Sequence, residues 1–426
     1  MKHKVVTSCY QTLIHLGDLS RYRETELGGK ERNWGPAIGY YSLAAEIYPD
    51  SGVSHNQQAV IALADGNHLR ATYHLYRSLA VKEPHPLAKD NLELEFKKIV
   101  VAWARGELVS NTTTRDGSGT RRALTAWFVR LHSKCYKGED FPEHDELENE
   151  VMTQLAIELR EKPSEGILHK FIIINLAAEY FASSKLQGKL ALKSRWQVCV
   201  RSQRMIGGDQ SASAFKSYFF FLRLNIRAFL TLLRILQPEL ERSVGDDLPV
   251  ENMERPKQLS DKITLIARRV MPGLRLYSSW FVTNAAVLAA NIGDPATVVL
   301  TKEMWKGYAD ILTLLASAFP SQDLPVANYM LEEDSDTVGF KPLLSDRTRK
   351  IWYSDVKLKP KFSHPVVERH HPNVEMLIRV RDFLIDGLQL AMDDVGLSTC
   401  ARFPSLTLPL ECTSCIGGIA FRLSRK

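Results

Sequence analysis

Arg21 and Tyr22 are the first candidates for chemistry, and they lie in the stretch "HLGDLSRYR", residues 15–23. An arginine guanidinium presents a planar fork of donors that suits phosphate oxygens, and a tyrosine hydroxyl adds another donor. The pair therefore suggests a phosphate-binding site. The alternative, from this stretch alone, is a surface arginine that pairs with Glu24 or Glu26.

A second group of basic residues suggests contact with nucleic acid. The stretches "KSRWQVCVRSQR" and "ARRVMPGLR" place several arginines near a tryptophan. A basic face binds backbone phosphates with strong salt dependence, and an exposed tryptophan can stack on a base. Solvated helix faces with i,i+4 ion pairs are the alternative. The candidate contacts are Arg195, Arg201, Arg204, Arg268 and Arg269, with Arg275 in the same stretch.

Residue types for catalysis or metal binding are not arranged in a known pattern. The sequence has no Ser/His/Asp or Cys/His arrangement and no phosphate-cradling glycine loop. Cys412 and Cys415 form one CxxC, but a structural zinc site takes about four ligands and no second pair exists. We therefore expect no enzyme, no cofactor and no metal.

The elements that must position these residues are helices. Apolar residues recur every three positions from Leu13 to Tyr22, which predicts one helix over about residues 5–24. Gly17 then lies inside that helix, at a cost of about 1 kcal/mol relative to alanine. We expect a close helix contact at Gly17 to account for this cost.

Helical periodicity dominates the rest of the chain, and strict strand-like alternation is rare. The fold class is therefore predicted to be all-α. Arg223, Arg227 and Arg234 share one face of the apolar segment 217–237, and three arginines are too costly at bilayer depth. The further helical segments are 147–161, 167–184, 186–205, 261–291, and the stripes from Trp305 to Phe319 and from Met376 to Ala391.

An internal repeat of 34 residues joins two early segments. Ala37 aligns with Ala71, and Pro49 and Pro84 each follow a helical segment. This period, with small residues at helix crossings and proline as a stop, is typical of tetratricopeptide helix pairs. The alternative is an accidental match between two helices.

Composition and punctuation set broader limits. The 426 residues carry a net charge of +6 and 45% hydrophobic residues, and six scattered cysteines are typical of an intracellular protein with reduced thiols. The start of the chain lacks the apolar region of a signal peptide. Residues 110–120 and 237–258 are predicted loops. Residues 332–350, acidic then basic, are expected to leave the helical body, and the chain beyond about 395 to be poorly packed.

Several motifs resemble known families. "GDLSRYRE" is similar to the Gly-Asp-x-x-Arg-Tyr helix of 14-3-3 proteins. The stretches "YYSLAAEIYPDSGVSHNQQAVIAL", "HLYRSLAVKEPHPLAKDNL" and "YMLEEDSDTVGFKPL" resemble the Est family, the ever-shorter-telomere proteins and the related adaptors of nonsense-mediated mRNA decay. The resemblance runs from about residue 8 to about 395.

The resemblance implies a 14-3-3-like domain that merges into tetratricopeptide-like helix pairs, followed by a bundle of helical hairpins. It implies that Arg21 and Tyr22, and with them Asn56, bind phosphate on a partner protein. In 14-3-3 proteins two more basic residues come from an upstream helix, whereas only 16 residues precede Gly17 here. We therefore expect either an N-terminally truncated chain or lost phosphate binding.

The predicted organisation has four parts. They are a partial 14-3-3-like and tetratricopeptide-like domain (1–109), a helical hairpin domain of the DNA/RNA-binding type (121–345), a closing helical segment (346–395) and an irregular tail (396–426).

Three functions stay open at this point. The first is a non-catalytic adaptor that binds phosphorylated proteins of the mRNA decay machinery, in nucleus and cytoplasm and away from membranes. The second is a telomerase-associated subunit that binds telomerase RNA or single-stranded telomeric DNA. The third is a plain tetratricopeptide scaffold without phosphate recognition.

Overall fold

A computed structural model of the chain describes residues 2–27, 32–108, 118–161, 166–190, 209–245, 258–289, 295–354 and 357–392. The described part is helical almost throughout, which confirms the predicted all-α class. Its only strands are β1 (Tyr353–Ser354) and β2 (Lys357–Leu358), an antiparallel pair that joins Tyr353 to Leu358 and Ser354 to Lys357.

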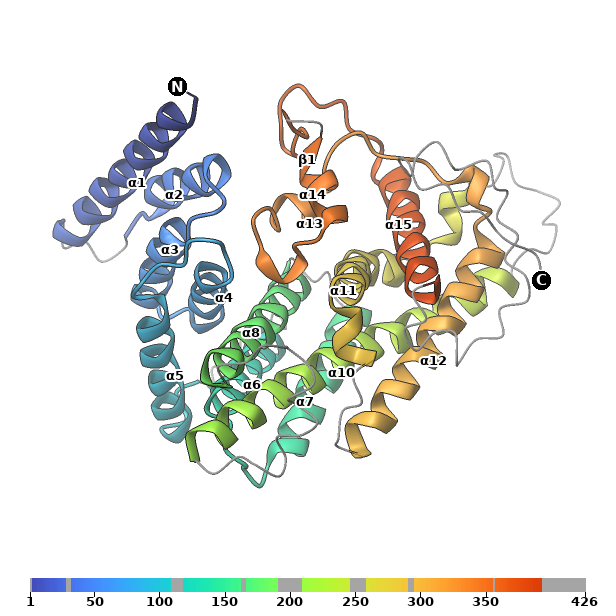
Figure 1. Cartoon of the computed structure of the whole chain (residues 1–426), viewed down its shortest axis with the longest axis horizontal. Coiled ribbons are helices and arrows are strands. Elements are labelled where there is room, and N and C mark those ends of the chain that lie inside the picture. Colours follow the sequence, from blue (N-terminus) through green and yellow to red (C-terminus); the bar gives the residue numbers. More distant parts are fainter. Residues whose placement is uncertain are drawn as a thin grey trace.

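The first five helices stack side by side, at the left of Figure 1, and we call them the repeat layer. The predicted helix pairs are confirmed, because Ala37, Ala44 and Ala71 have no exposed surface and Pro49 and Pro84 lie beyond the ends of their helices. The helices are α1 (Lys2–Glu26), α2 (Gly35–Ile47), α3 (Val53–Ala64), α4 (His68–Leu79) and α5 (Ala88–Ala104).

The remaining long helices form a body around a large apolar core (Figure 1). Trp280 of the predicted helical segment 261–291 and Trp305 of a predicted stripe lie inside this core and offer no face for a base. The helices are α6 (Ser118–Lys137), α7 (His144–Glu161), α8 (Ile167–Leu190), α10 (Asp209–Gly245), α11 (Leu265–Ala289), α12 (Pro295–Ala318) and α15 (Pro372–Met392), with the short turns η2 (Leu259–Lys262) and η3 (Ser321–Asp323).

The arginine face of α10 pairs with neighbouring helices. Arg223 and Arg227 both bind Glu148 of α7, at 2.9 and 3.1 Å, and Arg234 binds Glu303 of α12. Glu148 is 1% exposed, so its charge is neutralised inside the protein. Among the described residues, no helix combines the length and the apolar character needed to cross a membrane.

Residues 332–354, which we call the bridging segment, contradict the sequence expectation. Residues 332–350 were expected to leave the helical body, but Val338, Phe340 and Leu343 are at most 3% exposed. The segment contains α13 (Glu332–Ser335), η4 (Lys341–Leu343), α14 (Asp346–Trp352) and β1, and it lies between the repeat layer and α15 (Figure 1). The prediction was wrong because buried arginines neutralise the acidic start of the segment.

The bridging segment ties the repeat layer to the body. The Lys341 amide donates to the Ala80 carbonyl of the repeat layer at 2.9 Å, and Asn284 of α11 donates to the Pro342 carbonyl at 3.4 Å. Gly339 has a φ of +76°, and a Cβ there would lie 2.6 Å from the Pro49 carbonyl oxygen. Only glycine fits this close approach at a left-handed position.

Several sequence predictions fall outside the described residues. They concern residues 110–117 and 246–257 of the predicted loops, the helix 186–205 beyond Leu190, the pair Cys412 and Cys415, and the tail 396–426. The loop prediction was wrong at residues 118–120 and 237–245, which belong to helices α6 and α10. The domain limits stay predictions. The main core cluster includes residues from Ala59 to Leu390, on both sides of the limits at 109, 121 and 345.

Candidate phosphate-binding site

Gly17 explains how α1 approaches α2. Its Cβ, if present, would lie 2.4 Å from the Tyr41 ring, so the side-chain-free position lets the two helices pack closely. This confirms the contact predicted at Gly17. Tyr10, Ile14 and Tyr41 form a small apolar cluster at the same crossing, which fixes the rotation of α1.

Arg21 lies one turn beyond Gly17 and is held from two sides. Its Nε donates to the Tyr41 hydroxyl at 3.3 Å, and its Nη2 donates to Asp18 Oδ1 at 3.2 Å. The same Asp18 oxygen accepts from the Tyr41 hydroxyl at 2.7 Å and from Gln57 Nε2 at 3.2 Å. Three donors therefore converge on one carboxylate oxygen, which orients the guanidinium.

The surroundings stabilise the charge on Arg21. Burial opposes that charge, but the hydrogen bonds to Tyr41 and Asp18 outweigh it and raise the pKa of Arg21. Burial, together with the Asp18 contact, raises the pKa of Tyr41, so its hydroxyl stays protonated. At neutral pH the Arg21 guanidinium is therefore charged and the Tyr41 phenol is neutral.

Tyr22 lies beside Arg21 at the surface. Its side chain is 53% exposed, and the Arg21 guanidinium lies 4.4 Å from its ring centroid. The stacking fixes the plane of the guanidinium, and the exposed Tyr22 side chain can be reached from solvent. The structure thus brings together the two residues that the sequence paired.

Asn56 points elsewhere. It is 4% exposed, and its Oδ1 accepts from Asn91 Nδ2 of α5 at 3.1 Å. Neighbouring positions on a helix project about 100° apart, so Gln57, and not Asn56, reaches the α1 site. Sequence reasoning missed Gln57 and the role of Asp18, although the i,i+3 spacing of Asp18 and Arg21 was a usable signal.

The nucleic-acid candidates that the structure describes are bonded internally. Arg268 donates to the Ser260 and Ile263 carbonyls and to Asn373 Oδ1, between 2.6 and 3.1 Å. Arg269 donates to the last carbonyls of α7, those of Leu159 and Arg160, at 3.0 and 2.9 Å. These arginines join helix ends. Arg195, Arg201 and Arg204 lie outside the described residues.

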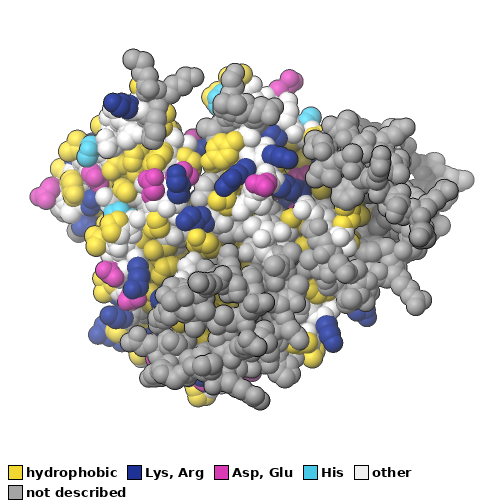
Figure 2. Space-filling model, viewed as in Figure 1, with side chains coloured by type: hydrophobic (Ala, Val, Ile, Leu, Met, Phe, Trp, Pro, Cys, Tyr) yellow, Lys and Arg dark blue, Asp and Glu magenta, His cyan; other side chains and the backbone are white. Residues whose placement is uncertain are grey.

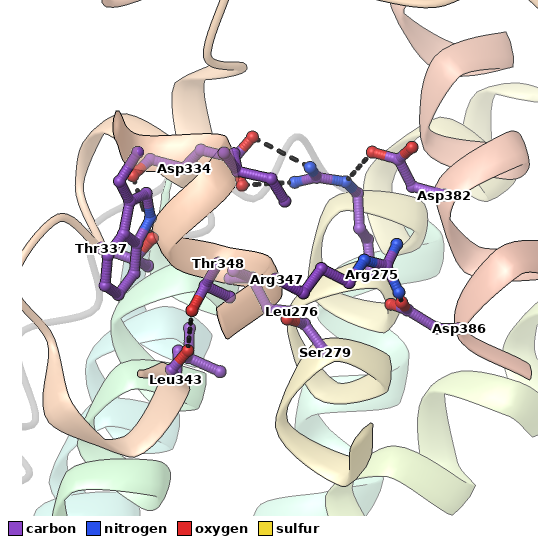
Figure 3. Close-up of a pocket in the computed structure, with 12 residues that line it drawn as sticks. Arg275, Leu276, Ser279, Asp334, Thr337, Leu343, Arg347, Thr348, Asp382 and Asp386 are labelled. Carbon is purple, nitrogen blue, oxygen red and sulfur yellow. Dashed lines mark hydrogen bonds and ion pairs between the residues drawn. The ribbon is translucent and has the colours of Figure 1, made fainter. Parts of the chain in front are cut away.

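Arg275, on the same helix as these candidates, is part of a buried ion-pair network (Figure 3). It is 6% exposed and contacts Asp334 at 2.7 and 2.9 Å, Asp382 at 2.9 Å and Glu333 at 3.4 Å. Burial opposes its charge, but Asp334 and Asp382 outweigh that and raise the pKa of Arg275.

The network continues on both sides of Arg275. Arg379 binds both oxygens of Glu333 at 2.8 Å, and Arg347 pairs with Asp386. A small pocket lies beside these pairs, with Ser279 and Trp352 also in its wall (Figure 3). The charged groups of this wall pair with one another. We therefore interpret the network as structural: its ion pairs hold the bridging segment against α11 and α15.

Comparisons with known proteins agree with this architecture. The family model of the Est1 DNA/RNA binding domain matches residues 37–347, and that of the telomerase activating protein Est1 matches residues 1–27. The solved structure titled "Crystal structure of Est1 and Cdc13" has a TM-score of 0.63 at 13% identity, over 91% of this chain and 68% of that one. That likeness shows the fold.

Curated relatives are similar over shorter stretches. "Nonsense-mediated mRNA decay factor SMG7-like" of Arabidopsis thaliana is 52% identical over 91 residues, 21% of this chain and 10% of that protein. "Telomerase-binding protein EST1A" of Danio rerio is 21% identical over 415 residues, 79% of this chain and 25% of that protein. The chain thus spans a quarter or less of the length of these two relatives. Because the Est1 DNA/RNA binding domain model covers well over half of the sequence, the chain belongs to the Est1 family.

Proposed function

We propose that the chain is a non-catalytic adaptor in nonsense-mediated mRNA decay that binds phosphorylated protein partners at Arg21 and Tyr22. The observation that carries the proposal is the oriented guanidinium of Arg21 beside the exposed Tyr22. The relative named as a decay factor, 52% identical over its matched stretch, supports the decay pathway. Partners of this kind would place the protein in nucleus and cytoplasm.

A phosphate can use the donors of Arg21 that Asp18 and Tyr41 leave free. A guanidinium carries five N–H groups, and the two contacts engage only Nε and Nη2. The Tyr22 hydroxyl adds a donor from the exposed side. Asp18 repels a phosphate, but the donors of Tyr41 and Gln57 on its oxygen weaken that repulsion.

The test is a charge reversal at Arg21 with a matched control two residues away. Arg21→Glu should lower the affinity for a phosphoserine peptide at least tenfold in fluorescence anisotropy, since it removes the fork of donors. Arg23→Glu makes the same charge change at a side chain that is 59% exposed and paired only with Glu24. It should change the affinity by no more than about twofold. Equal losses in both variants would refute a specific site and leave a scaffold without phosphate recognition.

A second candidate function is that of a telomerase-associated subunit that binds telomerase RNA or single-stranded telomeric DNA. The match of the Est1 DNA/RNA binding domain model to residues 37–347 favours it. Since Arg268 and Arg269 are bonded internally, such binding would need other basic residues. Binding of a telomeric single strand should then weaken steeply between 50 and 200 mM salt. A flat salt dependence would count against this function.

A further inference from the structure

Basic side chains converge where the repeat layer meets the body, and we call this place the seam. Helix α4 packs directly on α8 there, and the bridging segment covers the contact. Lys and Arg side chains are visible between these elements on the face that Figure 2 draws. The seam cluster consists of His55 of α3, Arg70, His74 and Arg77 of α4, and His169 and Lys170 of α8.

Arg77 is the centre of the cluster and is 4% exposed. Its Nη2 donates to the Asp336 backbone carbonyl at 3.0 Å, and its guanidinium lies 4.8 Å from the Phe340 ring centroid. Within the described residues no carboxylate forms an ion pair with it. A buried cation without an anionic partner is unfavourable, so the seam has a positive charge that is not neutralised.

The histidines show the same excess of positive charge. His55 Nδ1 and His74 Nδ1 lie 3.1 Å apart, which requires at least one neutral ring. Burial, with repulsion from Arg70, Arg77 and Lys170, lowers the pKa of His74 to about 3. Burial, with repulsion from Arg77 and His74, lowers the pKa of His55.

The outer part of the cluster is accessible. Arg70 and Lys170 are partly exposed, as is the His169 side chain, although its Nε2 atom is buried and has no hydrogen-bond partner among the described residues. Asp336, whose side chain is 57% exposed, is the acid at this edge, and its Oδ2 lies 3.4 Å from His169 Nε2. The next carboxylate, Glu333, is held by Arg379 and Arg275 and is not free to neutralise the seam.

We propose that the seam cluster binds a phosphate monoester, carried by a phosphorylated side chain of a partner protein, through Arg70, Lys170 and His169. A monoester brings close to two negative charges at pH 7, which matches the cations Arg70, Arg77 and Lys170. Burial lowers the pKa of His169, so this residue adds a neutral ring donor. A nucleic-acid strand fits less well, because the aromatic neighbours Tyr73 and Phe340 are buried and give no stacking surface. The site is separate from that at Arg21, so the inference goes beyond the proposed function.

Asp336 regulates access to this site. Its carboxylate pairs with His169 where a phosphate oxygen would bind, so the two anions compete. Its backbone carbonyl, which Arg77 uses, is retained in any side-chain variant. Removal of the carboxylate should therefore strengthen phosphate binding without loosening Arg77.

The test is calorimetric titration of the full chain with O-phosphoserine and, separately, with dimethyl phosphate. Arg70→Gln and Lys170→Gln should each weaken phosphoserine binding about tenfold, since each removes a charge-assisted hydrogen bond. Asp336→Asn should tighten it severalfold. Lys306→Gln, at an exposed lysine of α12, is the matched control and should have no effect.

The outcomes separate this site from the one at Arg21. The titrations are repeated in the Arg21→Glu background, so that phosphoserine bound at the proposed Arg21 site does not contribute, and the seam variants should show the same losses there. The proposal is overturned if Arg70→Gln and Lys170→Gln bind like the wild type, if Asp336→Asn weakens binding, or if phosphoserine does not bind at millimolar concentration. Dimethyl phosphate binding as tightly as phosphoserine would also overturn it, in favour of a nucleic-acid backbone.

Discussion

Arg77 in the repeat layer and Arg275 in the body are equally buried, at 4% and 6% exposure, but their surroundings are opposite. Arg275 contacts three carboxylates, whereas Arg77 contacts a backbone carbonyl and an aromatic ring. Arg275 stabilises the fold through its ion pairs. Arg77 leaves positive charge at the seam between the repeat layer and the body. The comparison shows that burial alone does not tell whether a basic residue is structural or available to an anion.

The bridging segment produces this difference. It directs the carboxylates of Glu333 and Asp334 toward Arg275 and Arg379 of the body. Two residues after Asp334, Arg77 of the repeat layer meets the backbone carbonyl of Asp336 and no carboxylate. One short acidic stretch therefore neutralises one side of the junction and leaves the other side positive.

The largest expected effect is on stability when the two arginines are replaced. Arg275→Met leaves the buried Asp334 without its arginine and Asp382 with the more distant Arg381, and should lower the free energy of unfolding by about 3–5 kcal/mol. Arg77→Met removes a buried charge and strands no carboxylate, so its cost should stay under about 1 kcal/mol. Urea unfolding at pH 7 measures both, with Lys306→Met as the exposed control. If Arg77→Met lowers the free energy of unfolding as much as Arg275→Met does, the two arginines do not differ in their structural role.

Acid should act on the repeat layer through His74. Its pKa is about 3 in the folded chain against about 6.5 unfolded, so the unfolded chain binds the proton first as the pH falls. The stabilisation is complete above pH 6.5 and is lost progressively from there toward pH 3.

His74→Gln should flatten the stability profile by up to about 1.4 kcal/mol per pH unit between pH 6 and 4. Urea unfolding of both chains across this range measures the difference. Parallel profiles for the wild type and the variant would show that His74 is not held neutral at the seam.

Two glycines should give effects smaller than that of Arg275→Met. Gly17→Ala places a Cβ 2.4 Å from the Tyr41 ring and should destabilise the chain by about 1–3 kcal/mol, despite the better helix propensity. Gly39→Ala, in α2, meets nothing within 4 Å and should stabilise by up to about 1 kcal/mol. Thermal unfolding compares the two. If both variants gain stability, the close crossing of α1 and α2 is incorrect.

Sequence reasoning succeeded where the signal was local. The periodicity of apolar residues predicted the α1 helix. The position of Gly17 inside that helix predicted the close contact with a neighbouring helix, which is α2. The 34-residue spacing gave the helix pairs, since small residues recur wherever two helices cross. Each of these follows from spacing within one or two helices.

The same reasoning failed where a partner is distant in the sequence. Arg275 and Asp334 are 59 residues apart, and Arg269 reaches a carbonyl 110 positions away. Nothing in the stretch "ARRVMPGLR" shows which arginine will contact a carboxylate in the folded protein. All three arginines were therefore candidates for contact with nucleic acid. The acidic start of the bridging segment was assigned to solvent for the same reason. At the candidate site, Asn56 was chosen by resemblance while helix rotation brings Gln57 to Asp18.

The most direct test of the account is the affinity of the chain for one serine peptide, measured with and without a phosphate on that serine. Fluorescence anisotropy at 150 mM salt suffices, with Arg21→Glu and Lys170→Gln measured alongside. The phosphorylated peptide should bind at least tenfold more tightly than the unphosphorylated one, and Arg21→Glu should lower the affinity for the phosphorylated peptide at least tenfold. Equal affinity for the two peptides in the wild-type chain would contradict the claim that the protein recognises phosphate.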